Sequence, residues 1–89
     1  MAQIMEEKLL KGIASSMEAT VRIGKNGITD HMLDEIKKQL KKRKIVKIKL
    51  LKSFVSGNDK KKAIEDVISK TGSKLIRKIG GAFVIYKGN

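Results

Sequence analysis

The chain has 89 residues, with 21 Lys and Arg against 9 Asp and Glu and no cysteine. This length fits a single domain over residues 1–89, and the missing cysteine excludes disulfides, thiolate metal sites and a cysteine nucleophile. No apolar run reaches the roughly 18–20 residues that a membrane span needs. The N-terminal MAQIMEEKLLKG is acidic and amphipathic, unlike a signal peptide. We therefore expect a cytoplasmic protein without membrane association.

The net charge of +12 indicates an anionic partner, because self-repulsion of so many like charges costs stability. Nucleic acid is the leading candidate, and the alternatives are an anionic membrane surface, an acidic protein, or charge that serves only solubility. Aromatic residues make up only 3% of the chain, whereas single-strand binders that work by stacking need rings. The composition therefore predicts recognition of phosphates and of backbone shape.

Helical spacing of apolar residues predicts a first helix over residues 4–17. Residues 20–23 alternate and are β-branched, which predicts a short strand, and the sequence GKNG follows. Thr29 is the expected N-cap of a second helix that runs to about Arg43. The strand-to-helix junction therefore falls on a polar, glycine-rich turn.

The second half of the chain begins with a clear strand over residues 45–51, in which apolar and basic residues alternate. Residues 53–58 are predicted to form a loop. A third helix follows, with Asn58 or Asp59 as its N-cap and Gly72 as the residue that ends it.

Two further strands, 74–79 and 82–86, are predicted to form a hairpin around Gly80 and Gly81. The element order is α-β-α-β-α-β-β, which predicts a two-layer α/β fold: a mixed four-stranded sheet and three helices. Because the strands alternate, helices should cover one face of the sheet only. The other face is expected to carry basic side chains, namely Arg22, Lys47, Lys49 and Arg77.

The GKNG turn suits a sugar–phosphate backbone. Gly24 and Gly27 lack Cβ and allow close approach, Lys25 supplies a charge, and Asn26 tolerates a left-handed conformation. Backbone amides of the turn and the following helix N-terminus both favour anions. KH domains clamp nucleotide backbones with such a GXXG loop. The alternative is a turn that only reverses the chain, and neither a Walker loop nor a dinucleotide fingerprint is present.

Three stretches resemble the CRM domain family, whose name stands for chloroplast RNA splicing and ribosome maturation. They are IGKNGIT with its following helix, the strand IVKIKL, and the ending TGSKLIRKIGGAFVIYKG. The resemblance runs from about Leu9 to Lys87. It implies RNA binding, association with precursors of the large ribosomal subunit, and the fold of the C-terminal domain of translation initiation factor 3.

The family's GxxG motif falls on Gly24, Lys25, Asn26 and Gly27, and Thr29 and Thr71-Gly72 also match the family's pattern. The chain departs from that pattern at Gly81, where a basic or bulkier residue is expected. If that side chain holds RNA in the family, Lys78 or Arg77 must substitute for it here.

Six of the eight residues from Lys37 to Lys44 are basic. The helix dipole explains cations in the last turn only, so we predict phosphate contacts, against the alternative of a solvated helix end. This end lies roughly 20 Å from the GKNG turn, so one RNA must span both, or the cluster is a second contact surface. Outside the turn, the predicted RNA contacts are Arg22, Thr29, His31, Lys37, Lys38, Lys41, Lys47, Lys49, Arg77 and Lys78.

Other candidates are weaker. Lys60, Lys61 and Lys62 open the third helix, where positive charge is unfavourable, and a ligand role is one explanation. His31 is either an exposed surface residue or an RNA contact. Neither a nucleophile nor an orienting group accompanies it, and no cluster has metal-ligand spacing. We expect a protein that is not an enzyme and needs no cofactor or metal.

The sequence thus predicts an RNA-binding protein that holds structured ribosomal RNA and assists assembly of the large ribosomal subunit. The alternatives are splicing, tRNA or small-RNA handling, a DNA-associated chromosomal protein, and an adaptor for an acidic protein. The oligomeric state is left open by the residues, and a monomer is the expectation. If about five phosphates are neutralised, log affinity should fall with log salt at a slope of roughly −3.5 to −4.5.

Overall fold

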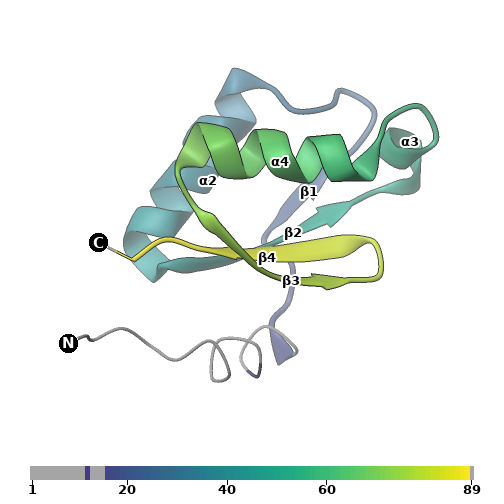
Figure 1. Ribbon diagram of the computed structural model, residues 1–89. Coiled ribbons are helices and arrows are strands. Elements are labelled where there is room, and N and C mark those ends of the chain that lie inside the picture. Colours follow the sequence, from purple (N-terminus) through teal and green to yellow (C-terminus); the bar gives the residue numbers. More distant parts are fainter. Residues whose placement is uncertain (1–11, 13–15, 89) are drawn as a thin grey trace.

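The computed structural model describes residues 12 and 16–88, and Figure 1 shows a four-stranded sheet with helices packed on one side. The predicted first helix, 4–17, lies outside the described residues except at Gly12 and Ser16, which are helical, and at Met17, which is not. In chain order the elements are β1 (Val21–Ile23), α2 (Asp30–Arg43), β2 (Ile45–Leu50), α3 (Lys52–Val55), α4 (Lys60–Thr71), β3 (Lys74–Ile79) and β4 (Ala82–Tyr86).

The strand order across the sheet is β1-β2-β4-β3. β1 and β2 are parallel, and β4 pairs antiparallel with β2 on one side and β3 on the other, which confirms the predicted mixed sheet. The carboxyl ends of β1 and β2 and the β3–β4 hairpin therefore meet at one end of the sheet. We call it the loop end, and it consists of residues 24–27, 51–59 and 80–81.

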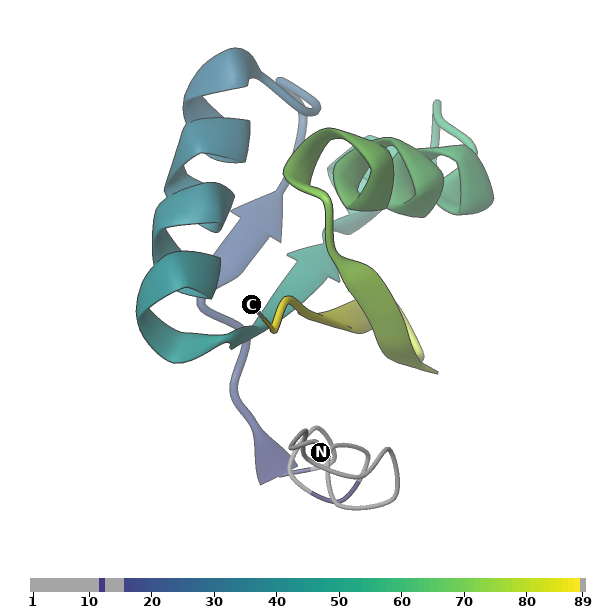
Figure 2. The same ribbon diagram turned by 60° about the vertical axis from the view of Figure 1, so that its left-hand side comes forward.

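The core lies between this sheet and the two long helices, α2 and α4, which cover the same face (Figure 2). Its centre is made of Ile36 and Leu40 from α2, Val67 from α4, and Ile48 and Phe83 from the sheet, each at most 1% exposed. This confirms the prediction that the helices cover one face of the sheet. Because α2 and α4 pack on one side, we call the opposite face of the sheet the open face.

The helix ends follow the predicted capping chemistry. Thr29 Oγ1 accepts a hydrogen bond from the Met32 amide at 3.1 Å, and the Asp59 carboxylate accepts one from the Lys61 amide at 2.9 Å. Gly72 ends α4 in the left-handed region with φ 66°. Asp59, and not Asn58, is thus the N-cap of α4. These caps fix where both long helices begin relative to the loop end.

One predicted loop is partly helical. Residues 53–58 were predicted as irregular, but α3 (Lys52–Val55) forms one turn of helix directly after β2. Its Phe54 is only 5% exposed and packs into the main core. The Asn58 side-chain amide donates to the Phe54 carbonyl at 2.8 Å and closes the turn. A single buried aromatic residue gives no helical period, which is why the pattern missed this helix.

The open face is less polar than predicted. Val84 on this face is fully buried, and Val84 and Ile76 form a second apolar cluster against which Met17 packs. The pairing shifts between Leu75 and Arg77, so β3 carries a bulge there. Residues 17–20 thus cover part of the face that the sequence assigned to basic side chains alone.

Candidate nucleic-acid interface

The GKNG segment forms a tight turn between β1 and α2. The Gly27 amide donates to the Gly24 carbonyl at 2.9 Å, and Gly27 has φ +72°, a conformation that glycine adopts at little cost. Lys25 and Asn26 lie at the tip of the turn and are exposed. The turn therefore presents one cation and one amide next to the N-terminus of α2, where backbone N–H groups favour anions.

The first glycine of the turn has an internal role that the sequence did not reveal. A Cβ at Gly24 would lie 3.2 Å from Leu51 Cδ1 and 3.3 Å from Ser53 Oγ. The Leu51 amide also donates to the Ile23 carbonyl at 2.9 Å. The base of the turn is thus packed against the segment that follows β2.

The loop end brings together most residues predicted near the turn. Thr29, whose hydroxyl caps α2, is exposed beside the turn, and His31 is exposed in the first turn of the helix. α4 also begins at this end, so the exposed Lys60–Lys62 share it with GKNG. The Leu50 amide donates to the Gly81 carbonyl at 2.7 Å and joins the β3–β4 hairpin to the same end.

The opposite end of the molecule gathers cations from four elements. We call it the tail end, and it comprises residues 41–44, 70–74 and 87. The Lys87 amide donates to the Lys44 carbonyl at 2.9 Å, and Lys87 Nζ donates to the Thr71 carbonyl at 3.2 Å. Lys74 is the pairing partner of Tyr86. Sequence reasoning identified the basic residues 41–44 here but missed Lys70, Lys74 and Lys87, because only the packing of α4 and the pairing of the strands bring them to this end.

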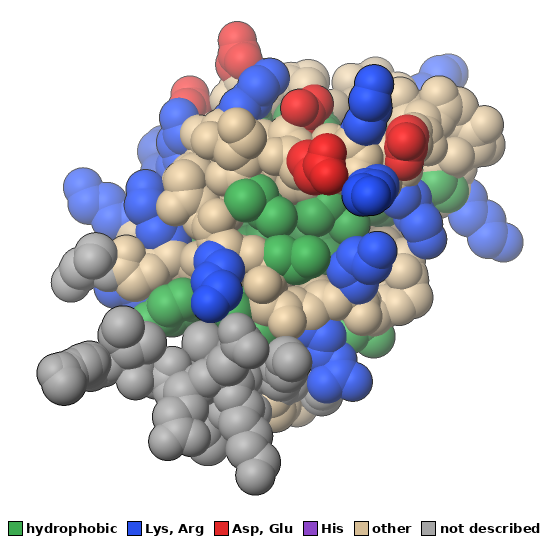
Figure 3. Space-filling view, viewed as in Figure 1, with side chains coloured by type: hydrophobic (Ala, Val, Ile, Leu, Met, Phe, Trp, Pro, Cys, Tyr) green, Lys and Arg blue, Asp and Glu red, His purple; other side chains and the backbone are tan. Residues whose placement is uncertain are grey.

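Charge is segregated along α2. Its acidic residues, Asp30, Asp34 and Glu35, all lie in its first half, whereas the charged residues from Lys37 onward are basic. Lys37 and Lys38 are exposed between the two ends. On the face that Figure 3 views, the Asp and Glu side chains lie in the upper part, whereas Lys and Arg side chains are spread over the whole of it. With 14 residues, α2 separates the two ends by roughly 20 Å.

The predicted basic residues of the sheet do not all share one face. Arg22 is the pairing partner of Lys49, and Arg77 pairs with Val84 on the same open face. Lys78 pairs instead with the core residue Phe83, so it lies on the helix-covered side. The remaining residue, Lys47, is half-buried on the open face.

Lys47 already has a partner within the protein. Its Nζ donates to the Met17 carbonyl at 3.0 Å, and the Thr20 amide donates to the Lys47 carbonyl at 3.1 Å. Both bonds hold residues 17–20 against β2. Within residues 12 and 16–88, no group of three His, Cys, Asp or Glu side chains could hold a metal ion, and no helix could cross a bilayer.

The fold and the distribution of charge define a small, strongly cationic α/β domain. Residues 4–87 match the CRS1/YhbY (CRM) domain family, and the chain belongs to this family. The resemblance seen in the GKNG turn, the strand IVKIKL and the C-terminal stretch is thereby confirmed, and it extends closer to the N-terminus than those motifs indicated.

Two relatives and one solved structure illustrate the similarity. The probable RNA-binding protein YqeI of Bacillus subtilis is 27% identical over 82 residues, covering 92% of this chain and 83% of YqeI. An RNA-binding protein of Haemophilus influenzae is 29% identical over 85 residues, covering 92% and 81%. The solution structure of a hypothetical Staphylococcus aureus protein, described as a proposed RNA-binding protein, matches with a TM-score of 0.75 and 29% identity, covering 93% of this chain and 84% of that one.

Proposed function

We propose that this protein binds structured RNA, that the RNA is ribosomal, and that binding assists assembly of the large ribosomal subunit without a chemical step. The observation that carries the proposal is the exposed Lys25–Asn26 tip, in a turn closed by the Gly27–Gly24 hydrogen bond at the N-terminus of α2, in a family whose relatives are named RNA-binding. A turn closed in this way loses less conformational freedom on binding than an open loop does.

The RNA backbone is held by charge and by backbone amides. Lys25 supplies a full positive charge at the tip, and the amides of the turn and of the first turn of α2 point toward the same phosphate. Asn26 contributes a donor and an acceptor suited to a sugar hydroxyl, which distinguishes RNA from DNA. The exposed lysines that open α4 lie on the same end and add affinity without sequence information.

The tail end extends this contact to larger RNAs. An RNA that occupies the loop end reaches the cluster of residues 41–44 only if it spans roughly 20 Å along α2, past Lys37 and Lys38. A folded ribosomal RNA holds phosphates at that separation, whereas a short single strand has no fixed fold that keeps its phosphates so far apart. The two basic ends therefore favour a structured partner.

The test is equilibrium binding to large-subunit ribosomal RNA fragments and to duplex DNA of matched length, at two salt concentrations. We expect the wild type to prefer RNA and the double variant Lys25→Asp, Asn26→Asp to lose at least tenfold in affinity, since it reverses the charge at the phosphate. The matched control is Ser69→Asp, Lys70→Asp, which makes the same change in net charge on exposed positions at the tail end. On an RNA fragment too short to span the roughly 20 Å along α2, this control should bind as the wild type does.

Equal binding of RNA and duplex DNA, unaffected by the turn variant, would contradict the proposal and favour a DNA-associated basic protein. The assembly role has its own readout: in cell extracts the protein should sediment with precursors of the large subunit at low salt and leave them at high salt. If the protein sediments with the precursors of neither subunit, the proposed ribosomal role is wrong and only the proposed RNA binding remains.

A further inference from the structure

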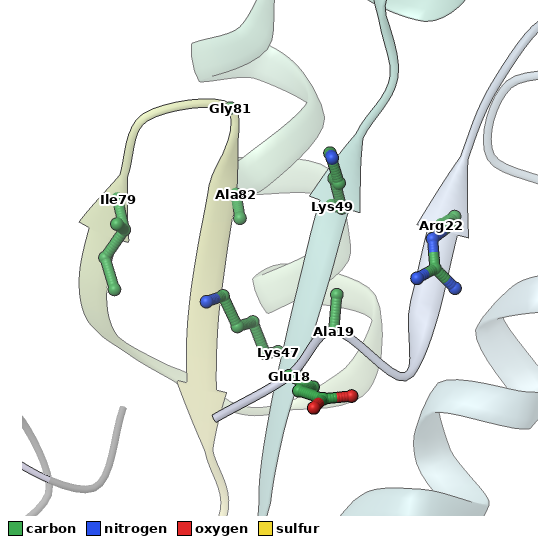
Figure 4. Close-up of a pocket in the computed structure, with 8 residues that line it drawn as sticks. All are labelled: Glu18, Ala19, Arg22, Lys47, Lys49, Ile79, Gly81 and Ala82. Carbon is green, nitrogen blue, oxygen red and sulfur yellow. The ribbon is translucent and has the colours of Figure 1, made fainter. Parts of the chain in front are cut away.

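The open face of the sheet carries a hollow of about 430 Å³ beside β1, β2 and the β3–β4 hairpin (Figure 4). Its charged lining consists of Arg22, Lys47, Lys49 and Glu18, and the rest of the lining is small or apolar, including Gly81. A volume of this size falls in the range of small-ligand sites. The hollow is distinct from the GKNG tip, which lies beyond the end of β1.

Arg22 and Lys49 form a like-charged pair within this hollow. The two residues are direct partners across the parallel β1–β2 pairing, so both side chains project from the open face. Neither side chain makes a hydrogen bond or an ion pair with any other described residue, and both are exposed. Like charges at opposed positions destabilise a sheet. An anion seated between them would remove the repulsion.

The other charged residues of the lining mark the opposite end of the hollow. Lys47 uses its Nζ to hold the Met17 carbonyl, so it anchors the segment that forms one wall. Glu18 lies beside Lys47, away from Gly81 and the hairpin (Figure 4). The site for an anion is therefore confined to the half of the hollow between Arg22 and Lys49.

The hairpin keeps that half of the hollow open. Gly81 lines it without a side chain, and its φ lies outside the left-handed region, so the backbone there does not require glycine. A Cβ at Gly81 would meet only the Leu50 carbonyl, at 3.4 Å. A larger residue fits the backbone at position 81 and would fill part of the hollow.

The hollow lies one short step along β1 from the proposed backbone clamp. Arg22 precedes Gly24 by two residues on an extended strand, a separation of about 6.6 Å. A nucleic-acid strand that leaves the GKNG tip along β1 therefore meets Arg22 first and Lys49 next. Only an unpaired strand is narrow enough to follow this path into a hollow of 430 Å³.

We propose that the hollow is a seat for an unpaired nucleotide of the RNA strand that the GKNG turn holds. Arg22 and Lys49 bind its phosphate, and the apolar surface of Ala19, Ile79 and Ala82 receives its base or sugar. The inference rests on the proposed RNA binding and adds to it a preference for RNA with a single-stranded extension beside a folded region.

The experiment compares one RNA hairpin with the same hairpin bearing a tail of a few unpaired nucleotides, so that the measured quantity is the gain due to the tail. In the wild type we expect the tail to tighten binding about tenfold at 0.1 M salt and to steepen the salt slope by about 0.7, since one phosphate charge on a single strand is neutralised. The double variant Arg22→Gln, Lys49→Gln should lose the gain and bind the tail-less hairpin as the wild type does.

Two further variants separate the hollow from general charge effects. Gly81→Leu fills the hollow without changing charge and should also lose the gain due to the tail. Lys42→Gln, Lys70→Gln removes two cations at the tail end and should keep the gain. Thermal unfolding of each variant identifies any that does not fold, and the charge variant and the filling variant each test the seat independently.

The outcomes distinguish the two levels of the argument. If the wild type binds neither RNA, the proposed function itself fails. If it binds both RNAs equally, or if the Arg22→Gln, Lys49→Gln variant keeps the full gain, RNA binding stands and the seat is wrong. If the control variant loses the gain as well, the tail is held by overall charge and the hollow has no specific role.

Discussion

The backbone of Gly24 packs against the side chain of Ser53, so that a Cβ at position 24 would lie 3.3 Å from Ser53 Oγ. The same Cβ would lie 3.2 Å from Leu51 Cδ1. The first glycine of the GKNG turn therefore serves the packing between the turn and α3, besides leaving room for a ligand. A loss of RNA binding on substitution of Gly24 has two separable causes.

We predict that Gly24→Ala lowers the free energy of unfolding by about 1 kcal/mol, because the neighbouring side chains must shift by a few tenths of an ångström. Adding Ser53→Ala removes one of the two close atoms and should restore part of the loss. Urea unfolding of the two single variants and the double variant measures the coupling. An unchanged unfolding midpoint for Gly24→Ala would mean that Gly24 matters only for ligand binding and not for packing.

Replacing a lysine in the first turn of α4 should have opposite effects on stability and on RNA binding. Lys62→Glu places a carboxylate in the first turn, where the helix dipole favours it, and should raise the free energy of unfolding by about 0.3–1 kcal/mol. The same change should weaken RNA binding. Lys70→Glu, in the last turn of the same helix, is the control and should lower stability instead. Equal RNA affinity for wild type and Lys62→Glu would leave this end of α4 outside the interface.

The separation of the two basic ends predicts that tail-end variants act only on long RNAs. Neutralising Lys41, Lys42 and Arg43 to glutamine should leave the affinity for a short RNA hairpin unchanged. For an RNA that spans more than roughly 20 Å along α2, the salt slope should become shallower by about 2–3. The measurement is the affinity for short and long RNAs over a series of salt concentrations. An equal loss of affinity for both RNAs would show that the cluster acts through its long-range charge and not through direct contacts.

Lys47 anchors the segment that crosses the open face, so its removal should loosen that segment. We expect Lys47→Met to lower stability by about 1 kcal/mol through loss of the bond to the Met17 carbonyl, and to speed hydrogen exchange of the Thr20 amide. Lys49→Met is the matched control on the same strand and face, because Lys49 makes no such bond. Similar exchange in both variants would mean that Met17 is held by its apolar contacts.

Local chemistry made much of the fold predictable. Thr29 and Gly72 were identified as helix ends because their roles depend on neighbouring backbone alone, and alternation identified the strands. The short α3 was missed because Phe54 is its only buried residue. The strand order and the bulge in β3 depend on pairings between distant residues, and no local pattern encodes them.

The candidate site was predictable to the same degree. The GKNG turn was found because its residue types carry its conformation, and the structure adds the contact between Gly24 and Ser53. The cations of Lys70, Lys74 and Lys87 were not grouped with the end of α2, because only the packing of α4 and the pairing of β3 and β4 place them there. The Arg22–Lys49 hollow likewise exists only once β1 and β2 are aligned in register.

The position of β4 constrains how the protein is made. It is the last strand in the chain, yet it lies between β2 and β3 and contributes Phe83 and Ile85, both fully buried, to the core. Until residues 82–86 have left the ribosome, β2 lacks its antiparallel partner and β3 has no neighbour at all. The sheet therefore closes only once β4 is available, and until then the exposed strands depend on their lysines to stay apart from other chains.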